Sequence, residues 1–513
     1  MIYFIDFGMP VKKSGIEHAA INRMHLFEKH GVDYRLLNRD WDANLHSETR
    51  KMGIDDTHLI NMFDYYQGSL IMEDKAISAE EVDLGLDPSL LIYTEDIDNK
   101  TYEVTRLDGM LFAKIGYRAE DKTVNFVESY DSFGKLIYID YYDSRGFKTV
   151  RCFNFNQTGI SNQQWYTPNG KVVISCALKL DGNKNIQLSG FILTKSDGKV
   201  YQFDTIDDMF SDFINQINNQ TSPGNIMVID QPIIADEALL NLDKPAYTIA
   251  HLHNSHVLDF RSPMTSELNE FFEYQLSNAD KYDGFIAATE HQTRDVQARF
   301  PDIKKLYTIP VGIVPDELFQ EPQIPMAERE YGNITVLARI AHEKRHADII
   351  RAVAKAHEQV PEITLNMYGY ANSNELKNEL ETLITNVHME KVIKFHEYTT
   401  DNDAVLNKAQ VFCVTSLFEG FNLAALESSS HGLVGVTYDI EYGPQEIIQD
   451  GFSGYIVREH DIDALAEKFV KLFKDQNLLQ QMSTNAYVSA KRYSAESIWK
   501  KWEQLLKDGS KEA

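Results

Sequence analysis

The residues best suited to chemistry are two cations that follow an apolar stretch of the chain. The stretch ends at Leu337, Arg339 follows it, and Lys344 stands at the expected start of a helix. A guanidinium offers paired N–H donors, an ammonium offers a point charge, and a helix N-terminus adds partial positive charge. Together they predict a clamp for a diphosphate, although an Arg–Lys pair alone is more often a solvated surface pair.

Two glutamates flank a glycine-containing turn further along the chain. Glu419 lies in the run Phe418-Glu-Gly-Phe-Asn-Leu423. Glu427 follows about two turns into a helix that we expect to begin near Leu423. The free backbone N–H groups of such a turn can bind an anion or a sugar hydroxyl. Glutamates at this spacing are common, and it is the Gly-Phe-Asn-Leu context that makes this pair a candidate site.

Two further segments carry weaker signals. Gly15 follows the first expected strand, where a glycine lets the backbone approach a phosphate, but it also suits an ordinary strand–helix turn. The chain has no G-x-G-x-x-G fingerprint. His251 and His253 share a face of an expected strand, and His256 follows in the loop. Because no carboxylate stands at a ligand spacing, we expect a histidine that bonds a substrate or packs in the core, and no metal site.

Alternating strand and helix patterns position these residues. Apolar runs of strand length are expected at 1–7, 225–229, 247–252, 284–288, 306–310, 334–337, 363–368, 392–395, 411–414 and 433–437. Helical patterns are expected at 16–30, 345–358 and 375–388, from Leu423 onward, and through 462–508. Such alternation is typical of parallel sheets whose ligands bind at the carboxyl ends of the strands. The sequence therefore predicts an α/β fold with two doubly wound, Rossmann-like units facing a cleft.

The middle of the chain has a different pattern. Between residue 80 and residue 210, aromatic and β-branched runs are separated by Asp108-Gly109, Phe133-Gly134, Asn169-Gly170, Asp181-Gly182 and Asp197-Gly198. Asn-Gly and Asp-Gly between such runs are typical of β-hairpins. Residues 101–200 hold 13 Lys and Arg against 10 Asp and Glu, so this part is weakly basic. We expect an antiparallel β insertion, either an ordinary meander with buried rings or a docking platform for an extended acceptor.

The composition excludes several classes of protein. The 513 residues carry a net charge of −27, which argues against general nucleic-acid binding. Cys152, Cys176 and Cys413 are too few and too scattered for a disulfide framework or a Cys-based zinc site, as suits a reducing compartment. Asp6 interrupts the N-terminal apolar run, and no run reaches the roughly 18 residues of a membrane span, so we expect a cytoplasmic protein.

Taken in order, the glycine turn, the histidine strand end, the Arg–Lys pair and the two glutamates resemble the family 4 retaining glycosyltransferases of the GT-B fold. Within that family the chain is similar to the bacterial enzymes that glycosylate serine-rich-repeat or Ser-Asp-repeat adhesins, and to the α-glycosyltransferases of wall teichoic acid. Ser14-Gly-Ile-Glu-His-Ala-Ala-Ile-Asn-Arg23, Asn61-Met-Phe-Asp-Tyr65 and the position of the β insertion carry this similarity. It covers essentially the whole chain outside the insertion.

The resemblance implies roles for four charged residues. Arg339 and Lys344 match the pair that holds the nucleotide diphosphate of the donor. Glu427 matches the glutamate that binds the donor ribose, and Glu419 matches the one near the hydroxyls of the donor sugar. Arg339 and Lys344 would stabilise charge on the departing phosphate in place of a metal, and no Asp-x-Asp stands at a suitable strand end.

Other positions complete the implied site. His253 matches the histidine near the reacting carbon, with His251 left open as the alternative. The backbone at Phe421, Asn422 and Leu423 would hold sugar and phosphate, Gly15 matches the phosphate-facing turn, and Tyr398 follows the strand that flanks the nucleobase. Glu397 departs from the pattern, because relatives often have glycine there.

The resemblance also implies a division of the chain. We expect residues 1–79 and 216–315 to form the N-terminal Rossmann-like, acceptor-side domain, and residues 80–215 to form the β insertion for acceptor binding or oligomerisation. Residues 316–485 would form the nucleotide-sugar-binding domain, and residues 486–513 a C-terminal helix that crosses back.

The expected activity is retaining transfer of GlcNAc or glucose from UDP-GlcNAc or UDP-glucose to Ser or Thr of a repeat-rich bacterial surface adhesin. We expect front-face attack, with the leaving phosphate taking the acceptor's proton, and no cofactor or metal. The expected partners are the UDP-sugar, a Ser-rich protein, a second glycosyltransferase subunit and further copies of the chain, but no nucleic acid.

Three alternatives stay open. The acceptor could be wall teichoic acid, a polyol phosphate, although a polyanion calls for a stronger basic track than the insertion offers. The chain could be a non-catalytic acceptor-binding subunit, but such a subunit has no need of Arg339, Lys344, Glu419 and Glu427. A glycogen or sucrose synthase-like enzyme suits the fold, but it leaves the insertion without a role.

Overall fold

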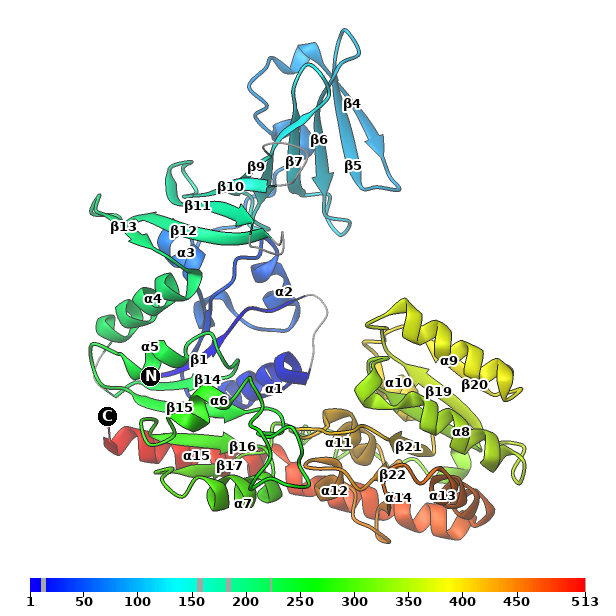
Figure 1. Ribbon diagram of the computed structural model, residues 1–513. Helices are drawn as coiled ribbons and strands as arrows, with labels where there is room; N and C mark the ends of the chain where they lie inside the picture. The colour runs from blue at the N-terminus through cyan, green and yellow to red at the C-terminus, as the bar shows by residue number, and fades with distance from the viewer. Residues whose placement is uncertain (11–14, 155–159, 181–185, 222–223, 513) are drawn as a thin grey trace. The chain divides into compact units, whose positions relative to one another are not determined.

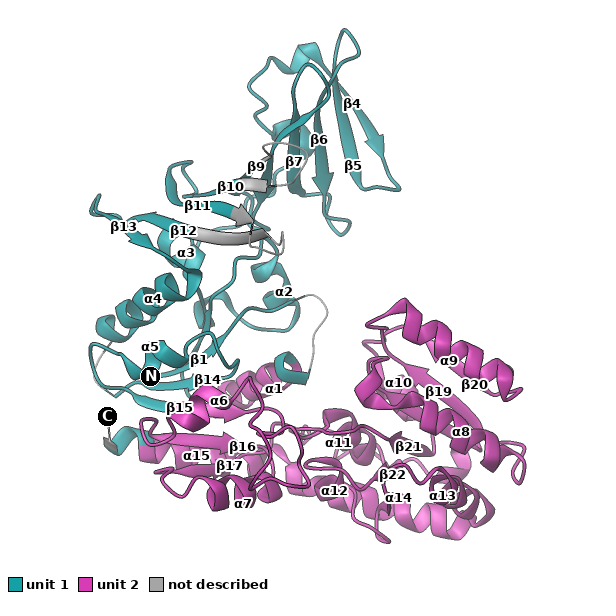
Figure 2. Ribbon diagram, viewed as in Figure 1, with its two compact units in different colours: residues 1–17, 31–248, 509–513 teal, residues 18–30, 249–508 magenta. Residues whose placement is uncertain are grey.

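The computed structural model describes residues 1–10, 15–154, 160–180, 186–221 and 224–512. The chain divides into two compact units (Figure 2). Unit 1 comprises residues 1–17, 31–248 and 509–513, and unit 2 comprises residues 18–30 and 249–508. The division passes through helix α1 (Gly15–Lys29) and strand β15 (Tyr247–Leu252). The residue boundaries of the five-part division predicted from the sequence stay predictions.

Unit 1 contains four parallel strands that pair in the order β14-β1-β2-β3. They are β1 (Ile2–Asp6), β2 (Tyr34–Asn38), β3 (Leu59–Asn61) and β14 (Ile226–Ile229). All five residues of β1 are buried, as its continuous apolar run predicts for an inner strand of a parallel sheet. The helices of this part are α2 (Leu45–Lys51), α3 (Met62–Gln67), α4 (Ile206–Gln220) and α5 (Asp236–Leu240).

A ten-stranded antiparallel sheet lies between α3 and α4 in the chain (Figure 1). Its strands pair in chain order: β4 (Leu91–Asp96), β5 (Thr101–Arg106), β6 (Leu111–Tyr117), β7 (Val124–Tyr130), β8 (Leu136–Tyr142), β9 (Lys148–Asn154), β10 (Ile160–Tyr166), β11 (Val172–Leu180), β12 (Ile186–Thr194) and β13 (Val200–Phe203). Four predicted turn glycines have positive φ, a backbone that glycine adopts without strain: Gly109, Gly134, Gly170 and Gly198. The fifth predicted turn, Asp181-Gly182, lies outside the described residues. The predicted antiparallel insertion is confirmed.

Several aromatic side chains of this sheet serve its core. Phe147, Trp165 and Tyr166 are buried. Trp165 stacks on Phe63 of α3, with ring centroids 4.9 Å apart. Burying these large rings removes apolar area from water and attaches the sheet to the helix that precedes it.

Unit 2 contains three parallel strands and a separate six-stranded parallel sheet. The three strands are β15, β16 (Gly284–Ala287) and β17 (Leu306–Thr308), paired in that order. The six-stranded sheet consists of β18 (Asn333–Leu337), β19 (Thr364–Tyr368), β20 (Ile393–His396), β21 (Val411–Val414), β22 (Val434–Tyr438) and β23 (Gly454–Val457). The helices that begin in this unit are α6 (Glu273–Ser277), α7 (Glu290–Arg299), α8 (His346–His357), α9 (Asn374–Asn386), α10 (Asn402–Leu406), α11 (Leu423–Ser430), α12 (Pro444–Ile447), α13 (Ile462–Lys474), α14 (Gln476–Ala490) and α15 (Ala495–Glu512).

The six-stranded sheet is doubly wound. Its strand order is β20-β19-β18-β21-β22-β23, so the chain builds outward from β18 on one side and then restarts beside it with β21. The order reverses between β18 and β21, and ligands of such sheets bind outside the carboxyl ends of the strands at this switch point. The doubly wound α/β architecture predicted from the sequence is confirmed.

Two observations concern the whole described part of the chain. Its three cysteines are buried and form no disulfide. None of its helices combines the length and the apolar character that a membrane span requires.

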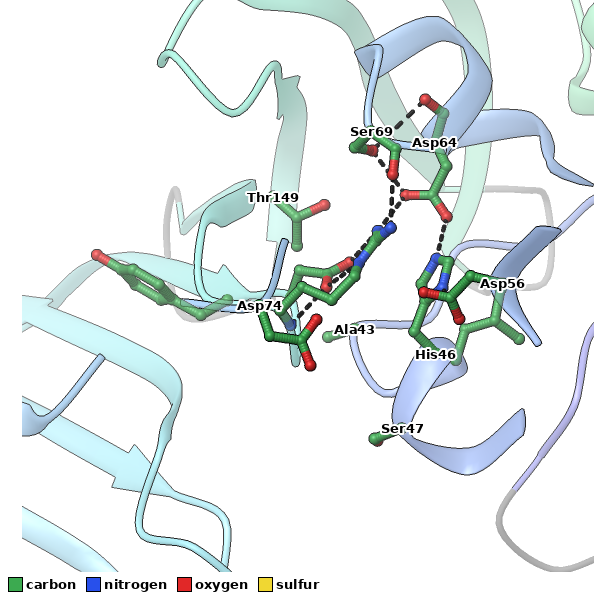
Figure 3. A network of polar contacts seen from close by, with 12 residues as sticks. Ala43, His46, Ser47, Asp56, Asp64, Ser69, Asp74 and Thr149 are labelled. Atoms are coloured by element: carbon green, nitrogen blue, oxygen red, sulfur yellow. Dashed lines mark hydrogen bonds and ion pairs between the residues drawn. The ribbon is translucent and has the colours of Figure 1, made fainter. Parts of the chain in front are cut away.

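A buried polar network joins the β insertion to the segment before it (Figure 3). Arg145 lies between β8 and β9 and is fully buried. Its guanidinium donates to Asp143 Oδ1 at 2.8 Å and to Asp64 Oδ1, on α3, at 2.9 Å. His46 Nε2, on α2, lies 2.8 Å from Asp64 Oδ2, and the Ser69 hydroxyl donates to Asp64 Oδ1 at 2.8 Å. Each of these carboxylates therefore faces a cation.

His46 supplies the second cation of this network. Burial alone would lower the pKa of its imidazole, but hydrogen bonds to Asp56 and Asp64 raise that pKa to about 9. His46, Asp64 and Asp143 lie close enough together to bind a metal ion. The guanidinium of Arg145, however, already bonds to both carboxylates, so a side-chain cation takes the place that a metal would occupy.

Replacing Arg145 by alanine is expected to destabilise unit 1 by about 3–5 kcal/mol, because Asp64 and Asp143 would stay buried without their guanidinium. The measurement is the urea midpoint of unfolding, followed by circular dichroism. The control is Lys122→Ala, which removes an exposed ion pair with Glu95 and should leave the urea midpoint almost unchanged. If the urea midpoint fell equally in the two variants, the buried ion pairs of Arg145 would contribute no more to stability than the exposed pair of Lys122.

Candidate functional site

The switch point between β18 and β21 brings two loops together. The two strands are neighbours, so their carboxyl ends open on the same edge of the sheet. Leu417 N–H donates to the Glu343 carbonyl at 2.7 Å, and the Thr415 hydroxyl donates to the Lys344 carbonyl at 3.0 Å. These bonds fix the backbone of Lys344 against the turn that carries Glu419.

Lys344 and Glu419 form an ion pair at this edge. Lys344 Nζ donates to Glu419 Oε1 at 2.7 Å, and the Ser416 hydroxyl donates to the same oxygen at 2.6 Å. The side chains of the pair are 18% and 12% exposed, so both charges are largely shielded from water. The pair places a cation suited to phosphate beside a carboxylate suited to sugar hydroxyls.

Arg339 extends from the same loop and is held at two points. Its guanidinium donates to Glu343 Oε1 and to Asn372 Oδ1, both at 3.1 Å. Asn372 comes within reach because Ile340 and Ala371 form a parallel bridge beyond the ends of β18 and β19. The Arg339 side chain remains 40% exposed, so its free N–H groups are open to an anion.

Gly420 lies against the end of β15, within unit 2. A Cβ built on Gly420 would lie 2.0 Å from the carbonyl oxygen of His253, so the approach excludes any side chain. His251 is buried and His253 is half-buried, with their ring centroids 3.8 Å apart. The close approach brings the strand end that carries His253 next to the turn that carries Glu419.

The turn before α11 presents backbone donors. Asn422 caps the helix in a left-handed conformation, with φ of 71°, and its side chain accepts from Ala425 N–H at 2.8 Å. The N–H of Leu423 is in the first turn and has no helix carbonyl one turn before it. The Phe421 ring is buried, 5.5 Å from the ring of Tyr493, and anchors the turn.

Glu427 lies in the second turn of α11 and is held from α10. Asn402 Nδ2 donates to Glu427 Oε2 at 3.0 Å. Burial raises the pKa of the Glu427 carboxyl to about 7; the hydrogen bond from Asn402 opposes this shift, and the charge of Asp403 adds to it. Burial and the charge of Glu427 raise the pKa of the Tyr398 phenol, which places Tyr398 within electrostatic reach of Glu427.

The structure gathers most of the predicted site residues in unit 2. They lie on the loops after β18 and β21, on α11 and at the end of β15: Arg339, Lys344, Glu419, Phe421, Asn422, Leu423, Glu427 and His253. Gly15 belongs to unit 1, where it begins α1, is exposed, and has open space at its Cβ position. Ser14 lies outside the described residues. The binding roles of all these residues stay predictions.

Four polar residues that contact the predicted ones were not predicted: Glu343, Ser416, Asn372 and Asn402. Glu343 and Ser416 are near Arg339 and Glu419 in the sequence, but these stretches lie largely in loops, where no spacing rule predicts a contact. Asn372 reaches its partner from the loop after β19, and Asn402 from the first turn of α10, and no local pattern marks such contacts.

Replacing Gly420 by alanine is expected to destabilise unit 2 by about 1–3 kcal/mol, because the new methyl group would collide with the His253 carbonyl and push the two segments apart. The thermal midpoint of unfolding measures the effect. Gly8→Ala is the control, since nothing lies within 4 Å of a Cβ there. A Gly420→Ala variant as stable as the control would show that the two segments are not in contact.

Comparison with known proteins finds similarity to glycosyltransferases. Residues 320–489 match the family model described as glycosyl transferases group 1. The chain is 24% identical to the GtfA subunit of UDP-N-acetylglucosamine–peptide N-acetylglucosaminyltransferase from Streptococcus pneumoniae, and the match covers 99% of each chain. It is 23% identical to the poly(glycerol-phosphate) alpha-glucosyltransferase of Bacillus subtilis, over 98% of this chain and 74% of that one.

Two solved structures share the fold. The pneumococcal O-GlcNAc transferase GtfA, in complex with UDP and GlcNAc, superposes with a TM-score of 0.83 at 21% identity and covers 99% of this chain and 98% of that one. A GtfA/B complex gives a TM-score of 0.79 at 22% identity and covers 99% of each chain. The chain therefore has the GT-B fold, and its residues 320–489 are similar to the glycosyl transferases group 1 family.

Proposed function

We propose that the chain is a retaining glycosyltransferase that moves GlcNAc or glucose from a UDP-sugar to Ser or Thr of a repeat-rich bacterial surface protein. The transfer takes place in the cytoplasm, before the acceptor is exported, and uses no metal ion. Support comes from the site on unit 2 and from the nearly full-length likeness to a GtfA subunit whose name states a UDP-GlcNAc donor and a peptide acceptor.

The pair formed by Lys344 and Glu419 carries this proposal. A UDP-sugar joins a diphosphate directly to a sugar, so its binding site needs cations for one group and hydrogen-bond acceptors for the other. Lys344 Nζ and Glu419 Oε1 lie 2.7 Å apart and offer one partner for each group. Arg339 on the same loop adds a second cation, and the first turn of α11 adds backbone donors.

The chemical step follows from these positions. The bond between the sugar's anomeric carbon and the β-phosphate oxygen breaks, and the acceptor hydroxyl oxygen bonds to the same face of that carbon. The hydroxyl proton passes to the leaving phosphate oxygen, and UDP departs. Arg339 and Lys344 stabilise the negative charge that develops on that oxygen, an interaction stronger in the transition state than in the ground state.

The chain's own cations make a metal ion unnecessary in this scheme. Arg339 offers paired donors and Lys344 a point charge to the diphosphate, which are the roles that a divalent cation otherwise fills. We place His253 near the reacting carbon, because its backbone lies against the Gly420 turn while the His251 side chain is buried.

The acceptor is assigned to the β insertion. Strands β4 and β13 are the outer strands of its ten-stranded sheet, and their free backbone edges can pair with an extended peptide. The word subunit in the name of the pneumococcal relative supports a second glycosyltransferase subunit as a partner. Self-association of the chain remains part of the proposal.

A polyol-phosphate polymer is the second candidate acceptor. The likeness to a poly(glycerol-phosphate) alpha-glucosyltransferase extends over 98% of this chain. A polyol-phosphate acceptor uses the same donor site and the same chemical step. A polyol-phosphate acceptor carries many negative charges, so the surface that binds it needs many cations. Residues 101–200 have 13 basic and 10 acidic side chains, an excess of only three.

Replacing Lys344 by alanine is expected to lower kcat for sugar transfer by about 10²–10³, because the leaving phosphate loses one source of charge stabilisation. Transfer is measured with radiolabelled UDP-GlcNAc and UDP-glucose, with and without EDTA. The wild-type rate should not change with EDTA.

The matched control is Arg351→Ala, which removes a cation from the exposed face of α8 and should leave kcat unchanged. A Lys344→Ala variant that transfers sugar at the wild-type rate would exclude the assigned clamp. Loss of wild-type activity in EDTA would exclude the metal-free scheme.

The acceptor and the stereochemistry are tested in one experiment. The chain, alone and with its partner subunit, is incubated with a UDP-sugar and either a Ser-rich repeat peptide or a polyol-phosphate polymer. We expect transfer to the peptide, with the α configuration in the proton NMR spectrum of the product. A β-linked product would rule out retention, and transfer to the polymer alone would replace the proposed acceptor.

A further inference from the structure

Glu427 is held by a contact that lies outside the predicted site. Asn402, the first residue of α10, donates from Nδ2 to Glu427 Oε2 at 3.0 Å. Asp401 caps α10 by accepting from Ala404 N–H at 3.0 Å, which fixes the turn that carries Asn402. Asn402 therefore approaches the carboxylate from a defined backbone and not from a mobile loop tip.

A second link ties the same turn to α11. His431 Nε2 lies 3.1 Å from Asp403 Oδ1, and His431 Nδ1 lies 2.8 Å from the carbonyl oxygen of Glu427. Adjacent residues of α10 thus reach the side chain of Glu427 and the end of its helix. The Asn402 contact holds the Glu427 side chain, and the His431 contact holds the backbone of Glu427.

Binding a ribose makes two demands on this carboxylate. The two neighbouring hydroxyls of the ribose donate best to an ionised carboxylate, whose two oxygens both accept hydrogen bonds. The side chain must also be turned toward the nucleoside. Asn402 serves both needs, because an N–H that donates to a carboxylate favours its charged form, and a bond to Oε2 leaves Oε1 for the ligand.

The surroundings of Glu427 otherwise oppose its charge. Burial raises the pKa of its carboxyl to about 7, and the negative charge of Asp403 acts in the same direction. The Tyr398 phenol, ahead of α10, has an ordinary pKa far above 7, and burial and the charge of Glu427 raise that pKa further, so it adds no charge near pH 7. Among these groups, the Asn402 amide is the one that lowers the pKa of Glu427.

We propose that Asn402 is a positioning residue for the donor nucleotide: through Glu427 it holds an ionised, correctly turned carboxylate at the ribose and thereby sets the nucleotide affinity at neutral pH. This role rests on the proposed UDP-sugar site. Helix α10 forms no part of the Arg339–Lys344 clamp or of the turn at Gly420. Through Asn402 it nevertheless controls how tightly the donor binds.

The test is calorimetric titration of UDP into the full chain, in EDTA, from about pH 6 to about pH 9. The wild-type affinity should fall about tenfold per pH unit below about pH 7, because a proton on Glu427 removes one acceptor. In Asn402→Ala the onset of this fall should move up by about one pH unit, so that affinity at pH 7 drops about fivefold and recovers toward pH 9.

Three variants make the result specific. Asn407→Ala changes the same residue type at the other end of α10 and should keep the wild-type pH profile. Asp403→Asn should move the onset in the opposite direction, toward lower pH, because it removes a negative charge near Glu427. Glu427→Gln should bind UDP weakly at every pH, because the amide cannot ionise.

The outcomes distinguish a failure of the proposed UDP-sugar site from a failure of the role assigned to Asn402. If the wild type binds no UDP at any pH, the proposed function fails. If it binds UDP but Asn402→Ala weakens binding equally at all pH values, or not at all, only the role of Asn402 fails. Thermal unfolding of each variant shows whether it is folded, and Asp403→Asn supplies an independent shift of the pH profile if Asn402→Ala does not fold.

Discussion

The site depends on one constraint, the adjacency of β18 and β21 in a parallel sheet. The chain completes two further strands between them, yet the loops that follow these two strands open side by side and are hydrogen-bonded to each other. Lys344 meets Glu419 only because of this adjacency. The ion pair is thus a consequence of the winding of the sheet, and the same winding orients the first turn of α11 toward the same edge.

Much of this arrangement was accessible from the sequence. Strands that are buried on both faces read as continuous apolar runs, as β21 and β22 do, and these two were predicted closely. The neighbouring strands β19 and β20 are only partly buried, yet their positions were also predicted to within one residue. Residue pairs such as Asp108-Gly109 and Asn169-Gly170 predicted the hairpins of the insertion, and their glycines have positive φ in the structure. The residues at strand ends followed from the rule that loops at the carboxyl edge carry function. Three parallel strands were missed, β2, β3 and β23, with five, three and four residues. Their length is not the reason, because β17 with three residues and β21 with four were predicted.

The remaining features depend on contacts between distant segments. Asn402 and Glu427 lie on different helices, and nothing in either local sequence indicates that they touch. Gly420 was predicted for its turn, but the structure shows that a close approach to His253 also requires glycine there. A spacing rule applies within one element, whereas these contacts arise from the packing of several.

The Arg145 network has a consequence for the modularity of the chain. The guanidinium comes from the β insertion, whereas Asp64 and His46 come from helices that precede it. The stacking of Trp165 on Phe63 crosses the same boundary. The β insertion therefore cannot be removed independently of the rest: a chain without it would keep Asp64 and His46 but lose Arg145, one of the two cations that bond to the Asp64 carboxylate. Exchange of such insertions between related proteins requires that the two sides of this network change together.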